Sequence, residues 1–214
     1  MSRAEENAAD GCAREPQRWR VLDSKMALDE TWCRIRRETV RLPDGSVLED
    51  YFLAVRPEVA VVFAVSDARR VPLVRQYKHG AGAVTLELPA GTFTTERAED
   101  AGLRELREET GWWSDDVVSI GEFFDDASKN TNRVHCVVAL RAAPLFEQEL
   151  DDTERASGLE VVEVGLDEIP DLLGHGLIKA QSSVACAYRS LVWLREKGLF
   201  DELPSPPKPG DFRS

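Results

Sequence analysis

The sequence predicts a mixed α/β fold, in which strands lie on both sides of one central amphipathic helix and a second long helix follows near the end. Short apolar runs rich in β-branched residues precede and follow the segment 95–110, and within that segment the apolar spacing changes to that of a helix. The sequence contains no apparent internal repeat. Such an arrangement favours mixed α/β layers over a doubly wound parallel sheet.

The first predicted elements are strands. The run RIRRETVRLPDGSVLEDYFLAV alternates apolar and polar residues on both sides of Pro43-Asp44-Gly45, which is typical of a hairpin with a tight turn. Two β-branched runs, EVAVVFAVSD and RRVPLVRQYK, come next. We expect both to be buried strands.

The central element is a predicted helix over Thr95–Thr110. Its apolar positions are Ala98, Ala101, Leu103 and Leu106. Because these positions recur at helical spacing with charges between them, one face is expected to pack on the sheet. Gly111 suits a left-handed C-terminal cap, after which Trp112 and Trp113 can pack back on the helix.

The rest of the chain completes this order. The runs VVSIGEFF, RVHCVVALRA and LEVVEVGL predict strands, LDEIPDLLGHG predicts a short helix, and AQSSVACAYRSLVWLREKG predicts a longer helix that ends at Gly198. We expect a disordered polar tail over 1–17, a strand region over 18–57, the main domain over 58–200 and a proline-rich tail over 201–214.

Composition restricts the class of function. With 214 residues, 43% of them hydrophobic, the chain can bury a substantial core in one domain, or in one domain with a small appendage. A formal net charge of -12 disfavours nucleic-acid binding, although a metal ion could still bring in a small anionic substrate. The sequence has no apolar run for a membrane span or a signal peptide, so we expect a cytoplasmic protein with no membrane partner. The four cysteines are widely spaced, and we expect them to be free thiols.

The stretch RELREETG raises an electrostatic question. Helical spacing places Glu105, Glu108 and Glu109 on one face, close to the C-terminal end of the helix, where the helix dipole disfavours carboxylates. A solvated acidic face, with Arg104 pairing with Glu108, is one interpretation. The other is a site for Mg²⁺ or Mn²⁺, because hard oxygen ligands suit these cations and because they bridge to substrate phosphates.

The preceding stretch LELPAGTF supports the metal interpretation. A predicted strand runs into Pro89-Ala90-Gly91, expected as a turn where carbonyls point outward and a ligand can approach. The chain thus runs through a strand, a glycine loop, Glu96 and then the glutamate face. This order can place carboxylates and a backbone carbonyl close to one point. A plain strand-to-helix turn is the alternative.

The run GTFTTERAEDAGLRELREETGW resembles the Nudix box, Gly-x5-Glu-x7-Arg-Glu-apolar-x-Glu-Glu-x-Gly-apolar. From Glu96 to Trp112 the match is complete, whereas Gly91 and Glu96 are separated by one residue fewer than in the family. The resemblance covers roughly residues 19–198, and VRQYKHGAGAVTLELPAG is similar to the approach to the box in the ADP-ribose pyrophosphatase branch. It implies an α/β/α sandwich with a mixed sheet, and a homodimer formed through the N-terminal strands.

The resemblance also implies site residues. Glu105 and Glu109 would be the main metal ligands, Glu108 a further carboxylate, and the Ala90 carbonyl would complete the shell, while Arg104 would orient the glutamates. A general base is expected from the acidic loop after the box, with Glu154 and Glu149 as candidates. Glu87 could reach the metal or pair with Arg104. Each of these roles is an expectation.

Substrate contacts are expected from three further places. On the strand before the box, Lys78 is preferred to Arg75 as a phosphate contact, since only one strand face can point inward. The loop DDASKNTNRVH could be no more than a polar hairpin turn, but the resemblance implies that a loop in this place borders the substrate, so ribose or phosphate contacts are expected through Ser128, Asn130, Asn132 and Arg133. Trp19 and Trp32 could stack on a base, although a core aromatic is the more common role for such a residue.

The leading hypothesis is a Mg²⁺-dependent hydrolase of nucleoside diphosphate sugars, most simply of ADP-ribose. Dinucleoside polyphosphates and nucleoside triphosphates are the alternative substrates. A Nudix domain that senses a nucleotide without cleaving it is a different class, and an acidic interaction protein with a coincidental helix is a third.

Overall fold

The structure is a computed structural model that describes residues 16–199. The predicted tails, 1–17 and 201–214, therefore lie almost wholly outside the described residues. The chain divides into two compact units, Met1–Val55 and Arg56–Ser214.

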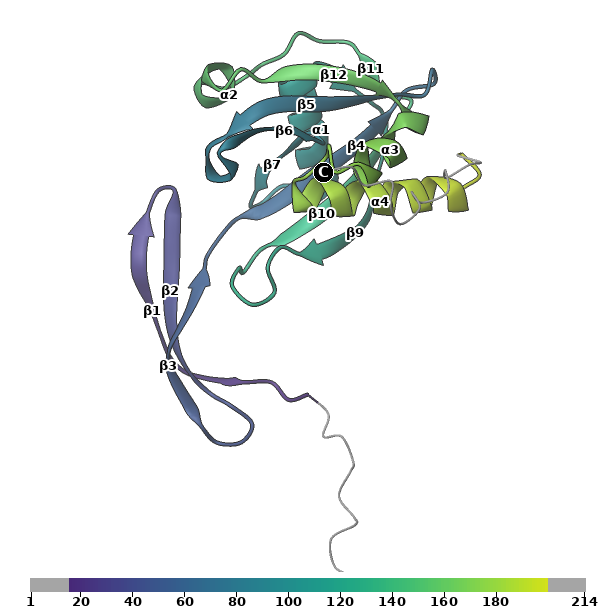
Figure 1. Cartoon of the computed structure of the whole chain (residues 1–214). Helices are drawn as coiled ribbons and strands as arrows, with labels where there is room; N and C mark the ends of the chain where they lie inside the picture. The colour runs from purple at the N-terminus through teal and green to yellow at the C-terminus, as the bar shows by residue number, and fades with distance from the viewer. Residues whose placement is uncertain (1–15, 200–214) are drawn as a thin grey trace, which may run out of the picture. The chain divides into compact units, whose positions relative to one another are not determined.

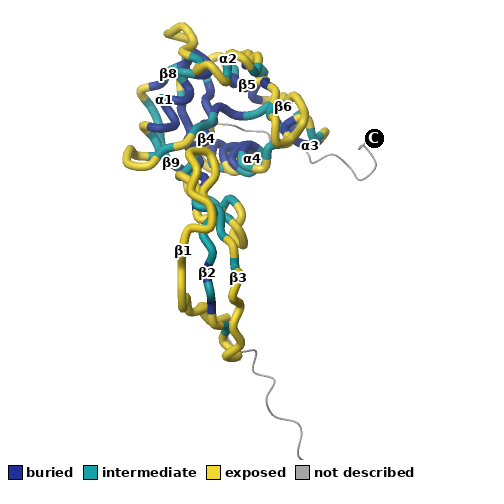
Figure 2. The backbone as a smooth tube through the Cα atoms, turned by 90° about the vertical axis from the view of Figure 1, so that its left-hand side faces the viewer, coloured by how far each residue is buried: buried dark blue, intermediate teal, exposed yellow. Residues whose placement is uncertain are grey.

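The N-terminal unit is an antiparallel sheet of order β1-β2-β3. Its strands are β1 (Arg20–Glu30), β2 (Cys33–Arg41) and β3 (Val47–Ala54). The turn between β2 and β3 confirms the predicted hairpin: Gly45 has a φ of 90°, and the Asp44 carboxylate accepts hydrogen bonds from the Ser46 N–H and hydroxyl. Every residue of β1 is exposed, as Figure 2 shows.

The second unit is built on a mixed four-stranded sheet of order β7-β4-β10-β9 (Figure 1). These strands are β4 (Glu58–Val65), β7 (Ala90–Phe93), β9 (Asp116–Phe124) and β10 (Arg133–Leu140). Only β4 and β10 pair in parallel, and the other neighbours are antiparallel. Since β4 and β10 are apolar on both faces, this sheet must be covered on both sides.

Helices provide that cover. On one face α1 (Ala98–Thr110) packs Leu103 and Leu106 against Val62 and Val137. On the other face α4 (Gln181–Glu196) closes a larger core whose buried members include Phe63, Leu73, Val138, Cys186 and Leu191. The result is the expected α/β/α sandwich, with buried strands between the two helices in Figures 1 and 2.

A second sheet has the strand order β12-β5-β6 and precedes β7 in the chain through its strand β6. The remaining elements are β5 (Arg70–Lys78), β6 (Ala83–Glu87), β8 (Trp112–Trp113), β11 (Ala143–Pro144), β12 (Glu160–Gly165), α2 (Asp152–Ala156), α3 (Ile169–Gly174) and short 3-10 segments at His79–Ala81 and Leu166–Glu168. Two residues after β6 the chain enters β7, which lies beside α1. No helix in the described part of the chain is both long and apolar enough to cross a membrane.

Two sequence predictions need correction. The helix begins at Ala98 rather than at Thr95. Pro89-Ala90-Gly91 is not a turn, because Ala90 and Gly91 belong to β7 and pair with Val61 and Ala60 of β4. Ladder pairing with a central strand thus takes precedence over the turn tendency of a Pro-x-Gly sequence. At the other end of α1, Gly111 forms the predicted left-handed cap with a φ of 73°.

Candidate active site

The glutamates of α1 do not form a solvated stripe. Glu105 and Glu109 are 8% and 3% exposed, and they lie on the helix face that packs toward β7. They are one helical turn apart, so their side chains are neighbours. Glu108 lies at the margin of this face and remains partly exposed. The fold therefore buries two carboxylates side by side, which requires compensating partners.

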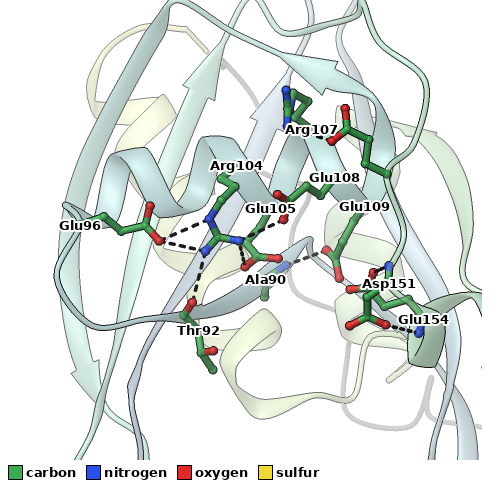
Figure 3. Close-up of polar contacts among 11 residues, drawn as sticks. Ala90, Thr92, Glu96, Arg104, Glu105, Arg107, Glu108, Glu109, Asp151 and Glu154 are labelled. Carbon is green, nitrogen blue, oxygen red and sulfur yellow. Dashed lines mark hydrogen bonds and ion pairs between the residues drawn. The ribbon is translucent and has the colours of Figure 1, made fainter.

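Glu109 meets the backbone of β7. Its Oε2 accepts a hydrogen bond of 2.9 Å from the Ala90 N–H (Figure 3). Burial raises the pKa of Glu109 well above its usual value; the Ala90 N–H and Lys78 oppose this rise, while the charges of Glu105 and Glu154 add to it. Ala90 thus brings its N–H to a site carboxylate, and a role for its carbonyl remains an expectation.

Glu105 occupies the space over Gly91. An added Cβ on residue 91 would stand 1.8 Å from Glu105 Oε1 and 2.4 Å from Oε2. Since Gly91 does not have a left-handed backbone conformation, a glycine is needed at this position only because Glu105 approaches so closely. Burial raises the pKa of Glu105, and the adjacent Arg104 counteracts the rise.

Arg104 joins the polar groups around α1. Nη1 lies 2.6 Å from Glu105 Oε1 and 3.0 Å from Glu108 Oε2. Nη2 donates to Glu96 Oε1 at 2.9 Å and to the Thr92 carbonyl at 3.2 Å. Partial burial lowers the pKa of the Arg104 guanidinium, but the contacts with Glu96, Glu105 and Glu108 outweigh this effect and leave the pKa above its usual value. The side chain can thereby fix the directions of several carboxylates at once.

The donor set suits a hard divalent cation. Glu105 and Glu109 offer only oxygen atoms, and the Glu109 carboxylate has a neutral N–H as its hydrogen-bond donor. A cation would offset the burial that raises both pKa values. Within residues 16–199 no three acidic, histidine or cysteine side chains already stand together as a complete metal site. Glu105 and Glu109 alone therefore do not make up a complete metal site.

The neighbouring strands separate the two predicted phosphate contacts. Lys78, at the end of β5, lies 3.8 Å from the Glu87 carboxylate, and its charge acts on Glu109. Arg75 lies on the opposite face of β5 and pairs with Glu160 at 2.6 Å, both side chains being exposed. Strand alternation therefore places Arg75 on the face opposite Lys78, and a phosphate contact through Arg75 stays a prediction. Glu87 pairs with Lys78 rather than with Arg104.

The acidic loop after the box is more ordered than its composition indicates. Residues 152–156 form α2, and Asp151 caps this helix. Glu154 lies in its first turn, and its charge raises the pKa values of Glu105 and Glu109. Glu149 is directed elsewhere, since its carboxylate pairs with Arg107 at 3.0 Å. Asp151 was not anticipated, although the spacing Asp-x-x-Glu is itself a signature of a capping box.

The loop between β9 and β10 is fixed by its own polar contacts. Asn130 Nδ2 donates to Asp125 at 2.8 Å, and the Ser128 N–H donates to Asp126 at 2.9 Å. Arg133 pairs with Glu122. Asn132 is 1% exposed and neither amide atom has a hydrogen-bond partner among the described residues, so it is closed to a ligand in this conformation.

The two tryptophans proposed to stack on a base belong to the N-terminal unit. Trp19 makes an edge contact with Tyr51, with ring centroids 5.6 Å apart. Trp32, in the turn between β1 and β2, is 97% exposed. Neither side chain is buried as a core aromatic, and stacking on a base stays a prediction.

Comparison with known proteins matches both units. Residues 19–53 match the model of the nucleoside diphosphate sugar hydrolase N-terminal domain, and residues 55–183 match the NUDIX domain. The chain is 30% identical to an ADP-ribose pyrophosphatase of Bacillus subtilis over 157 residues, which cover 72% of this chain and 83% of that protein. It is 38% identical to an ADP-ribose pyrophosphatase of Mycobacterium tuberculosis over 79 residues, which cover 36% of this chain and 38% of that protein.

The fold has a solved counterpart. A crystal structure of an ADP compounds hydrolase superposes with a TM-score of 0.75 at 20% identity, covering 87% of this chain and all of that one. This likeness supports the α/β/α architecture. The match to the NUDIX domain over residues 55–183 and the similarity to the Bacillus subtilis protein show that the chain belongs to the Nudix family of pyrophosphohydrolases.

Proposed function

We propose that the protein hydrolyses the diphosphate bond of a nucleoside diphosphate sugar, and that ADP-ribose, cleaved to AMP and ribose 5-phosphate, is its substrate. The observation that carries the proposal is the burial of Glu105 and Glu109 side by side against β7. The substrate class is supported by the similarity to two ADP-ribose pyrophosphatases. Water adds to one phosphorus, the bridging P–O bond breaks, and the proton of the water is released.

Mg²⁺ is the cofactor proposed for this site, with Mn²⁺ as a substitute. Such a cation, when bound, polarises the phosphoryl oxygens and lowers the pKa of water. Glu105 and Glu109 would hold it, while Glu108 would leave its contact with Arg104 to contribute a further oxygen. The Ala90 carbonyl and Glu87 are the other proposed ligands, and Arg104 keeps Glu105 oriented.

The protein's own side chains divide the remaining work. Lys78 would neutralise substrate phosphate charge, since its own charge already acts on Glu109. Glu154 would accept the proton of the attacking water, because carboxylates held by a metal are poor bases. Ser128, Asn130 and Arg133 are proposed to border the sugar or the phosphates.

A substrate panel tests the proposal. The purified protein is incubated with ADP-ribose, other sugar nucleotides, dinucleoside polyphosphates and nucleoside triphosphates, with Mg²⁺ or with EDTA. We expect release of AMP from ADP-ribose that requires the cation and is lost in Glu105→Gln. Faster turnover of a polyphosphate would reassign the substrate. Tight binding without turnover of any compound would favour a nucleotide sensor.

We also propose that the protein works as a cytoplasmic homodimer formed through the N-terminal unit. Exposed apolar side chains on β1 to β3 support a partner for that sheet, among them Val21, Met26, Leu28 and Phe52. The free thiols of Cys136 and Cys186 suit a reducing compartment. Sedimentation equilibrium should give twice the chain mass for the wild type and a lower mass for Leu28→Arg, whereas a wild-type monomer would exclude the dimer.

A further inference from the structure

The segment 145–150 is tied to the carbonyl end of α1. The N–H groups of Leu145 and Phe146 donate to the Gly111 carbonyl at 3.0 and 2.9 Å, and the Glu149 N–H donates to the Glu108 carbonyl at 2.8 Å. Gln148 Nε2 donates to the Glu109 carbonyl at 2.6 Å. The last carbonyls of a helix have no partner within it, so these bonds satisfy them. As a result, the segment after the box is held against the backbone of the site glutamates.

Asp151 continues this connection into α2. Asp151 Oδ1 accepts the Glu154 N–H at 2.7 Å, and Glu154 Oε2 accepts the Asp151 N–H at 2.8 Å. This reciprocal pair is a capping box, which satisfies two free N–H groups at the start of the helix. It also restricts the rotamers of Glu154, a side chain that is otherwise free to swing into solvent.

The capped carboxylate is directed toward the site. The negative charge of Glu154 raises the pKa values of both Glu105 and Glu109, although Glu154 comes from a different element. Figure 3 shows Asp151 and Glu154 on the far side of Glu109 from Arg104. Arg104 and the cap therefore approach the two buried glutamates from opposite sides.

We propose that Asp151 is a positioning residue, whose cap holds the Glu154 carboxylate beside Glu105 and Glu109 for the hydrolysis proposed above. The role in turnover rests on that proposed function, whereas the cap itself rests on the two hydrogen bonds between Asp151 and Glu154. Asp151 acts through Glu154, and a residue that acts through another has no effect once the other is gone.

A double-mutant cycle tests this coupling. Asp151→Ala removes the acceptor for the Glu154 N–H and should lower kcat by roughly 3- to 30-fold, with KM changed by less than about threefold. Asp151→Asn keeps a good N-cap and should restore most of kcat. Glu154→Gln keeps the capping box, because Gln also completes it, but removes the carboxylate. In the Glu154→Gln background, Asp151→Ala should therefore cause no further loss.

A second readout does not depend on activity. Hydrogen exchange of the Glu154 amide should be roughly 3- to 30-fold faster in Asp151→Ala than in the wild type. Ser66→Ala, which removes a side-chain acceptor from the turn between β4 and β5, serves as the control and should change neither kcat nor this exchange rate.

The outcomes separate the two proposals. Equal kcat losses from Asp151→Ala in both backgrounds would overturn the positioning role, as would an increase in kcat on releasing the cap. Unchanged amide exchange in Asp151→Ala would show that the cap does not form in solution. A wild type with a protected Glu154 amide but no turnover would defeat the proposed function, and the positioning role with it, while leaving the cap intact.

Discussion

Gly91 of β7 and Glu105 of α1 approach so closely that a Cβ atom on residue 91 would stand 1.8 Å from Glu105 Oε1. This contact explains why a glycine occupies a strand position, where it has no favourable propensity. The space that a side chain would fill is the space that the carboxylate needs.

Gly91→Ala should therefore displace Glu105 without unfolding the protein, because the obstructing group is the end of a flexible side chain. We expect kcat/KM to fall by about 10- to 100-fold, which is the range found when metal ligands lose their orientation. The free energy of unfolding in urea should change by less than about 1 kcal/mol.

Gly80→Ala is the matched control. Gly80 has an ordinary φ and nothing lies within 4 Å of the added Cβ, so both activity and stability should stay near the wild-type values. If Gly91→Ala were as active as the wild type, close approach of Glu105 to β7 would not matter for the reaction.

Glu109→Gln should stabilise the metal-free protein at neutral pH. Burial raises the folded-state pKa of Glu109, so the folded protein binds more protons than the unfolded chain at pH values above the unfolded pKa, about 4.3. Stability of the wild type therefore falls as pH rises through this window. The Gln variant lacks this dependence and can still accept the Ala90 N–H.

The measurement is thermal unfolding with EDTA at several pH values. We expect Glu109→Gln to exceed the wild type by roughly 1 kcal/mol at pH 7 to 8, or about 2 to 4 °C in Tm, with the gap closing near pH 4. Adding Mg²⁺ should then raise the Tm of the wild type more than that of the variant. A gap that widened on acidification would contradict the assigned burial effect.

The sequence predicts the fold well where one pattern dominates. The buried face of α1 follows from the spacing of Leu103 and Leu106, and the left-handed cap follows from Gly111. Ala90 and Gly91 could not be placed from local pattern, because their conformation depends on pairing with β4, which is distant in sequence. Long-range pairing of this kind overrides turn propensity.

For the glutamates of α1, the sequence predicts which side chains are grouped but not which of them are buried. Helical spacing groups Glu105, Glu108 and Glu109 on one face, yet it cannot tell which two become buried, since that depends on where β7 lies. The opposite directions of Lys78 and Arg75 follow from strand alternation, but which of the two faces lies toward α1 depends on tertiary packing that the local sequence does not contain.

Arg104 should be hard to replace. A lysine offers its donors from a single nitrogen atom, whereas the guanidinium bridges Glu96, Glu105 and Glu108 from two separate nitrogen atoms. We expect Arg104→Lys and Arg104→Ala to weaken Mg²⁺ binding by about 10- to 100-fold in isothermal titration calorimetry, with a parallel loss of kcat/KM.

Arg107→Ala provides the comparison on the same helix. Arg107 makes an exposed pair with Glu149, which is worth little in water, so Mg²⁺ affinity should change by less than about threefold. Equal effects of the two alanine variants would mean that Arg104 contributes only general positive charge.

Glu154 and Glu149, the two candidate bases, are separated by their surroundings. Glu149 points to Arg107 on the outer side of α1 and is more than half exposed, while the charge of Glu154 acts on both buried glutamates.

Glu154→Gln should lower kcat by roughly 100- to 10,000-fold, the usual contribution of a general base, and Glu149→Gln by less than about threefold. Both variants should unfold at wild-type urea concentrations, because Gln keeps the capping box and the pair at Glu149 is exposed. Steady-state kinetics at saturating Mg²⁺ decides, and the reverse order of effects would move the base to Glu149.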